Sequence, residues 1–185
     1  MKKLLGLIIT VTLTNIAACV NVYAIRLELI PQTVSTISSS KETRDIRVLV
    51  YFEIPEKIVA ENIHLDYARL IFEAEISKEK MGQIEIYPLT VSWKDSGELD
   101  WSSTWTKDGG DYSVERAGRP VTIKSDEGEK IIQTDVSYIV KDWLNGKMEN
   151  YGFIIVPSNL DLAVSDIEYS IYTKNIKLLI HYELE

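Results

Sequence analysis

The stretch IRVLVYFE at Ile46–Glu53 indicates the fold class more directly than any other part of this 185-residue chain. Every second residue from Ile46 to Phe52 is apolar, so a β-strand would place these side chains on one face. Leu49 and Tyr51 would lie on the opposite face, because side chains alternate along a strand. We therefore predict a strand that is covered on both sides, as in the interior of a layered β-structure.

Further segments on both sides of this stretch alternate in the same way. We predict strands at residues 25–30, 65–75, 84–88, 119–124, 130–136, 151–157, 167–172 and 176–183. Many short strands separated by turn signals are typical of an antiparallel β-sandwich or a barrel. The predicted fold class is therefore all-β.

One segment, 136–145, has a different period. Its apolar residues recur at the spacing i, i+3, i+4, i+7 and i+8, and they are Val136, Ile139, Val140, Trp143 and Leu144. Asp135 or Ser137 can cap the start of such a segment, and Gly146 follows its end. We predict one short amphipathic helix here, packed across an open end of the core.

Charge and cysteine content exclude several classes of function. Twenty Lys and Arg residues against 28 Asp and Glu residues give a net charge of −8. An acidic surface repels phosphate backbones, so we expect no nucleic-acid partner. The single cysteine can form neither an internal disulfide nor a cysteine-based zinc site.

Residues 1–24 are typical of a secretory signal peptide. Two lysines precede an almost unbroken apolar run at residues 4–13, which is too short to span a bilayer. Cleavage after Ala24 fits this segment, and so does a lipobox that ends at Cys19 and leaves that residue lipidated. In both cases we expect residues 25–185 to form a single domain outside the cytoplasm.

Several motifs follow one another along the chain in a characteristic order. They are RVLVYFEIP (47–55), YARLIFEA (67–74), VSW (91–93), STW (103–105), GGDY (109–112), DVSYIVKDWLNG (135–146), NYGFII (150–155) and LLIHYE (178–183). Together they resemble the DNRLRE domain of secreted bacterial and archaeal proteins, also classed as carbohydrate-binding module family 96. The resemblance spans about residues 25–183, and its most specific part is the helix motif followed closely by YGF. It implies a β-sandwich of jelly-roll type that is secreted, non-catalytic and able to bind carbohydrate.

The least regular stretch, residues 90–118, holds three of the four tryptophans. Long loops often carry function, and aromatic rings can stack under the flat faces of sugar rings while polar groups bind the hydroxyls. The predicted carbohydrate-binding residues are Trp101, Trp105, Asp108, Asp111 and Tyr112, with a second patch at Tyr169 and Tyr172. Trp93 and Trp143 are predicted to lie in the core. Arg116 and Arg119 could form a basic patch that accepts an acidic glycan.

Two other functions remain open at this point. The domain could be an envelope module that contacts a partner protein, and an exposed face at Leu49 and Tyr51 would favour this, although a central strand explains these residues more simply. The domain could instead be a polysaccharide-active enzyme, with carboxylates such as Asp95, Glu98 and Asp100 near the tryptophans. No catalytic motif supports this, and a charged loop is the simpler interpretation, so we expect no enzymatic activity.

A structural calcium ion is chemically conceivable. The loop carboxylates that could bind it are Asp108, Asp111, Asp161 and Asp166. Their spacing matches no calcium motif, so no metal and no cofactor is assigned from the sequence.

Overall fold

The computed structural model describes residues 24–39, 46–60, 63–75, 82–96, 99–123, 130–159 and 172–184. The elements in chain order are β1 (Ala24–Leu29), β2 (Thr33–Ser38), β3 (Ile46–Tyr51), α2 (Glu56–Ala60), β4 (Ile63–Glu75), β5 (Gly82–Pro88), the 3₁₀ turn η1 (Val114–Arg116), β6 (Val121–Ile123), β7 (Lys130–Asp135), α3 (Ser137–Leu144), β8 (Phe153–Asn159) and β9 (Tyr172–Leu184). The predicted strands at 25–30, 46–53, 65–75, 84–88, 119–124, 130–136, 151–157 and 176–183 each overlap a strand of the structure, although β6 is shorter than predicted and β9 begins earlier. The predicted strand at 167–172 lies outside the described residues except for Tyr172, which begins β9.

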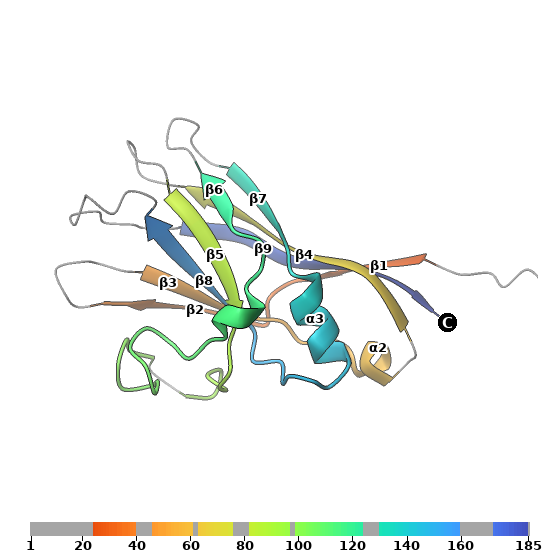
Figure 1. Cartoon of the computed structure of the whole chain (residues 1–185), viewed down its shortest axis with the longest axis horizontal. Helices are drawn as coiled ribbons and strands as arrows, with labels where there is room; N and C mark the ends of the chain where they lie inside the picture. Colours follow the sequence, from red (N-terminus) through yellow and green to blue (C-terminus); the bar gives the residue numbers. More distant parts are fainter. Residues whose placement is uncertain are drawn as a thin grey trace, which may run out of the picture.

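The strands form two antiparallel sheets that face each other (Figure 1). One sheet has four strands in the order β1-β9-β4-β7, and the other has five in the order β2-β3-β8-β5-β6. From β3 to β9 the chain passes repeatedly from one sheet to the other, so that neighbours in a sheet are distant in sequence. This arrangement is a β-sandwich of jelly-roll type, as expected, with β2 added as an outer strand beside β3.

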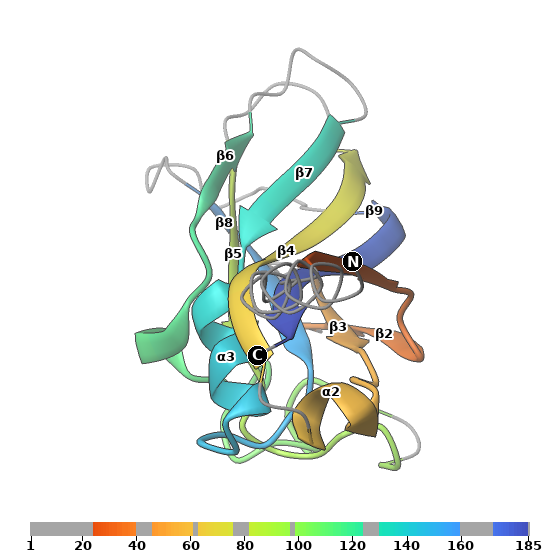
Figure 2. The same cartoon turned by 90° about the vertical axis from the view of Figure 1, so that its right-hand side faces the viewer.

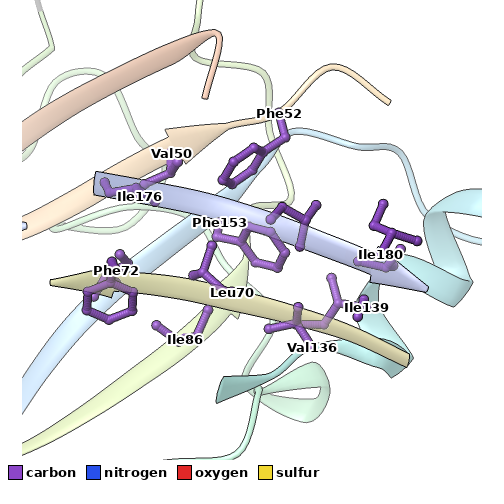
Figure 3. Close-up of a cluster of buried hydrophobic side chains, with 14 of the residues drawn as sticks. Val50, Phe52, Leu70, Phe72, Ile86, Val136, Ile139, Phe153, Ile176 and Ile180 are labelled. Carbon is purple, nitrogen blue, oxygen red and sulfur yellow. The ribbon is translucent and has the colours of Figure 1, made fainter. Parts of the chain in front are cut away.

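The main core fills the space between the sheets (Figure 3). Val50, Phe52 and Phe153 enter it from the five-stranded layer, and Leu70, Phe72 and Ile180 enter it from the four-stranded sheet. All six side chains are fully buried. The alternation that predicted β3 and β4 therefore has a direct cause, since every second side chain points into this core.

Helix α3 closes one end of the sandwich beside α2 (Figure 2). Ile139, Val140 and Trp143 are buried against the main core. The Ser137 backbone N–H donates to Asp135 Oδ1 (2.8 Å), and Gly146, at φ 64°, donates its N–H to the Trp143 carbonyl (3.1 Å). The predicted helix, its glycine end and the core position of Trp143 are confirmed, whereas the N-cap residue is Val136, which forms no side-chain cap hydrogen bond, and not Asp135 or Ser137.

Candidate functional site

The long loop between β5 and β6 folds over the outer face of the five-stranded sheet. A second hydrophobic cluster lies there, made of Ile37, Leu49, Leu89, Trp93, Trp105, Ile154 and Val156. Leu49 and Ile154 point away from the main core and are nevertheless fully buried. The prediction that the strand at 46–53 is covered on both sides is thus confirmed, and Leu49 offers no exposed apolar face.

Two tryptophans of the β5–β6 loop pack against the five-stranded sheet. Trp93 is 2% exposed and donates its Nε1–H to the Tyr151 carbonyl (2.7 Å), which confirms its predicted core position. Trp105 is 8% exposed and donates its Nε1–H to the Asp100 carbonyl (2.9 Å). Both rings are buried and both indole N–H groups are hydrogen-bonded, so the side of the loop that faces the sheet is well packed.

Two aspartates hold the loop together by accepting hydrogen bonds from its backbone and hydroxyl groups. Asp111 is buried and accepts from the Thr106 N–H (2.8 Å), the Thr106 hydroxyl (2.7 Å) and the Lys107 N–H (3.1 Å). Burial alone would raise the pKa of Asp111, but these hydrogen bonds outweigh it and hold the pKa below its ordinary value. Asp100 is exposed, and its pKa is lowered first by the Ser103 hydroxyl and then by the backbone N–H groups of Ser103 and Ser102.

Replacement of Asp111 by asparagine should therefore loosen the loop. We expect Asp111→Asn to lower the free energy of unfolding by about 1.5–3 kcal/mol at pH 7, because the amide cannot accept at both former oxygen positions. Since the folded-state pKa of Asp111 is depressed, its contribution is complete above the ordinary value of 3.8 and disappears as the pH falls through the folded-state pKa. Urea unfolding at pH 7 and at successively lower pH measures this. Asp95→Asn, which alters an exposed carboxylate of the same loop, is the control, and equal stability of both variants at pH 7 would contradict the expectation.

An aromatic group is exposed in part at the surface of this loop. We define the aromatic platform as the three half-buried rings Tyr87, Trp101 and Tyr112. The Tyr87 and Tyr112 rings stack with centroids 4.8 Å apart. The Arg47 guanidinium lies 4.6 Å from the Trp101 centroid and 5.7 Å from the Tyr112 centroid, so one cation joins the rings.

Hydrogen bonds fix the edges of the aromatic platform. Arg47 Nη1 donates to the Gly109 carbonyl (2.7 Å), and the Gly109 N–H donates to the Trp101 carbonyl (2.7 Å). The Tyr87 hydroxyl donates to Glu85 Oε2 (2.7 Å), and burial together with this bond raises the pKa of Tyr87 well above its ordinary value. The phenol therefore stays protonated over the physiological pH range.

A pocket of about 250 Å³ lies on the same side of the sandwich. Tyr51 and Tyr151 line it, and Lys94 Nζ lies 4.5 Å from the Tyr51 centroid. Both tyrosines are half-buried and pack against the second cluster, as the aromatic platform does. Aromatic surface and hydrogen-bonding groups therefore occur together at more than one point of this face.

The structure separates the residues that the sequence had grouped together. Trp101 and Tyr112 both contact Arg47 at the aromatic platform, whereas Trp105 and Asp111 lie buried beneath the loop surface, and Asp108 is exposed. Tyr169 lies outside the described residues, and Tyr172 lies in β9 with no described side chain.

The two arginines predicted as a basic patch have different surroundings. Arg116 forms an ion pair with Asp142 (2.7 Å) at α3, and Arg119 lines a cleft beside β7 together with Arg69. Arg47 and Tyr87 are the site residues that the sequence analysis missed. Both could have been identified from the sequence, because both lie at outward positions of predicted strands next to buried neighbours.

The described residues contain no group of three or more His, Cys, Asp or Glu side chains placed to hold a metal ion. Asp161 and Asp166, two of the calcium candidates, lie outside the described residues, as does Glu98 of the acidic cluster at 95–100. No helix within the described ranges is long and apolar enough to cross a membrane.

No protein-family model matches this chain, and no curated protein matches it. The resemblance to the DNRLRE domain therefore stays a prediction that depends on the motifs alone.

Proposed function

We propose that this protein is a non-catalytic module that binds polysaccharide outside the cell. The observation that carries the proposal is the aromatic platform, in which the half-buried rings of Tyr87 and Tyr112 stack and the Arg47 guanidinium connects them to the half-buried ring of Trp101. Aromatic rings supply contact area with few rotatable bonds, and neighbouring polar groups give orientation to a hydroxylated ligand. The resemblance to a carbohydrate-binding family supports the same function.

The packing of the loop supports a preformed site. Trp93 and Trp105 anchor the loop, and the carboxylates of Asp100 and Asp111 accept hydrogen bonds from its backbone. The loop would therefore need little further ordering when a ligand binds. A binding surface that is already ordered loses less conformational entropy on association. This favours binding at the aromatic platform over binding by a segment that must fold first.

The proposed location follows from residues 1–24, which we interpret as a signal peptide. Residues 1–23 lie outside the described residues, so the alternatives of cleavage after Ala24 and lipidation of Cys19 both stand as proposals. A lipid anchor at Cys19 would keep the module at the cell surface. Cleavage after Ala24 would release it.

The Trp101 ring is expected to contribute most to binding. We expect the wild-type protein to be retarded in native gels that contain one or two of a panel of neutral, acidic and amino polysaccharides. Trp101→Ala should weaken that interaction at least about tenfold, equivalent to about 1.4 kcal/mol, because it removes the largest ring of the aromatic platform. Affinity electrophoresis over a range of polysaccharide concentrations measures the change.

Tyr138→Ala is the matched control, because it removes a ring that is 80% exposed on α3, outside the loop. It should bind as the wild-type protein does. If Trp101→Ala and the wild-type protein bind the same glycan equally well, the aromatic platform is not the site. If the wild-type protein is retarded in no gel, the alternative of an envelope protein-interaction module takes the place of this proposal.

A further inference from the structure

The outer face of the four-stranded sheet contains a hollow at a β-bulge. Ile71 pairs with Lys177 and Glu73 pairs with Lys174, so two residues of β9, Asn175 and Ile176, lie opposite one residue of β4. Asn175 has a φ of 51°, which side-chain-bearing residues seldom adopt. Bulges with a left-handed first residue bend the strand and are frequent beside binding sites.

The hollow has a volume of about 580 Å³ and extends over all four strands of this sheet. Because neighbouring strands lie about 4.8 Å apart, four strands span about 14 Å, enough for a short oligosaccharide. Phe72 and Ile176 border the hollow at the bulge, while their side chains are buried in the main core. Ile131 of β7 lines it as well and is 68% exposed, so the hollow offers apolar contact at its edge.

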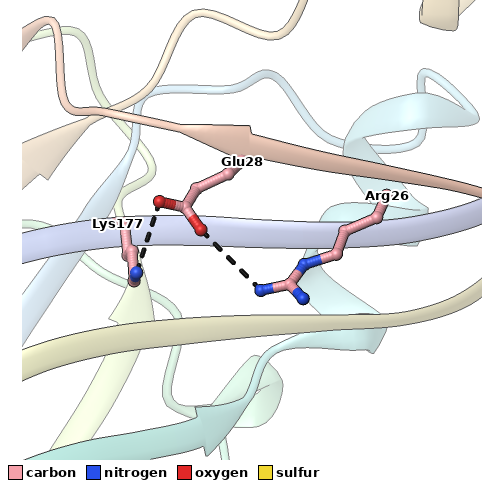
Figure 4. Close-up of polar contacts among 3 residues, drawn as sticks. All are labelled: Arg26, Glu28 and Lys177. Atoms are coloured by element: carbon pink, nitrogen blue, oxygen red, sulfur yellow. Dashed lines mark hydrogen bonds and ion pairs between the residues drawn. The ribbon is translucent and has the colours of Figure 1, made fainter.

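Polar side chains are held in place along the same hollow (Figure 4). Lys177 Nζ donates to Glu28 Oε1 (3.2 Å), while Arg26 Nη2 lies 3.9 Å from Glu28 Oε2. Asn175 Nδ2 donates to Glu73 Oε2 (2.8 Å), so the bulge residue itself joins this polar lining. Each of these groups has a fixed partner and still faces the hollow.

The side chains that line the hollow carry equal numbers of positive and negative charges. The side chains of Arg26 and Lys177 carry positive charge, and those of Glu28 and Glu73 carry negative charge, so an ionic ligand of either sign would meet a like charge. A neutral hydroxylated ligand can accept from the cations and donate to the carboxylates, as sugar hydroxyls do in pairs. The apolar edge at Ile131 suits the C–H face of a sugar ring.

We propose that this hollow is a second glycan site, which binds a neutral oligosaccharide on the sheet opposite the aromatic platform. The inference rests on the proposed function, because it assigns the same class of ligand to another surface. Two sites on one domain would let a single polysaccharide chain, or two neighbouring chains, be held with higher avidity than either site alone provides.

The test is the double variant Glu28→Gln/Lys177→Met, which removes one charge of each sign and leaves the net charge unchanged. Exposed ion pairs add little to stability, so this variant should fold and melt as the wild-type protein does. We expect its affinity for neutral polysaccharide, measured by affinity electrophoresis, to fall at least fivefold. The control Lys147→Met/Glu56→Gln makes the same two substitutions at exposed positions outside the hollow and outside the pocket at Tyr51 and Tyr151, and it should bind normally.

The outcomes separate the two proposals. If the wild-type protein binds neutral polysaccharide and the double variant binds it equally well, the hollow is not a site, but the proposed function stands. If the wild-type protein binds only charged polysaccharide, the neutral ligand assigned to the hollow is wrong, but the proposed function again stands. If the wild-type protein binds no polysaccharide, both proposals are wrong.

Discussion

Replacement of Gly152 by alanine is expected to lower the free energy of unfolding by at least about 4 kcal/mol, the largest effect that we expect from a single substitution here. Gly152 has a φ of 89°, and a Cβ atom at this position would lie 2.2 Å from the Val50 carbonyl oxygen and 3.0 Å from the Tyr51 Cα atom. Both contacts are with backbone, so no side-chain rotation can relieve them. The strand β3 would have to move away from the start of β8, where the two strands pair.

The same residue also connects the loop to the sheet. The Gly152 carbonyl accepts from the Leu89 N–H (3.0 Å), and its N–H donates to Asn150 Oδ1 (3.1 Å). A displaced backbone here would weaken both bonds and the burial of the second cluster. Urea unfolding measures the loss, and failure of Gly152→Ala to yield folded protein would agree with the expectation.

Gly146→Ala is the matched control for this substitution. Gly146 also has a positive φ, of 64°, but no atom lies within 4 Å of the position that its Cβ would occupy. It should lose only about 1 kcal/mol, because a left-handed conformation costs an alanine roughly this much. If both alanine variants lose the same amount of stability, the close contact of the added Cβ atom with β3 is not the cause of the loss in Gly152→Ala.

Trp143→Ala should have the second largest effect, a loss of about 3–5 kcal/mol. Trp143 is 5% exposed and packs on Phe153 with ring centroids 4.7 Å apart, so it joins α3 to the five-stranded sheet. Among the described residues no acceptor binds its buried Nε1–H. The loss should therefore come from the empty volume and not from a broken hydrogen bond.

A second substitution at the same position checks this interpretation. Trp143→Phe keeps most of the ring and removes the buried N–H group, so it should lose less than about half as much stability as Trp143→Ala. Tyr138→Ala, on the exposed side of α3, should stay within about 0.5 kcal/mol of the wild-type protein. Thermal and urea unfolding compare the three variants, and equal losses for Trp143→Phe and Trp143→Ala would contradict a packing role.

Some elements could not have been predicted from local sequence. Strand β2, TVSTIS, was missed because its two apolar residues, Val34 and Ile37, do not alternate. It is an outer strand that pairs, among the described residues, with β3 alone, and Ile37 is the one apolar residue on its inward face, since the other inward residues, Thr33 and Ser35, are polar. Helix α2 has five residues, too few for a helical period to be visible.

The candidate sites depend even more on distant contacts. Arg47 reaches Trp101 and Gly109 only because the loop after β5 folds back over β3. Trp105 resembles Trp101 in sequence, since both lie among small polar residues, yet only Trp105 is buried in the second cluster. The side that each ring presents to solvent follows from how the loop packs, which no local pattern encodes.

The sequence by itself determined the class of the fold, because alternation of apolar residues reports burial on one face and this depends on each strand alone. It also determined α3, whose spacing and terminal glycine are local properties. Only the tertiary structure decided which surfaces could bind a ligand. Arg47 contacts the aromatic platform at Tyr112, 65 positions away in sequence, and the hollow requires a register shift between β4 and β9. Such contacts arise from how the sheets pair and how the loop packs, and these depend on the whole chain at once.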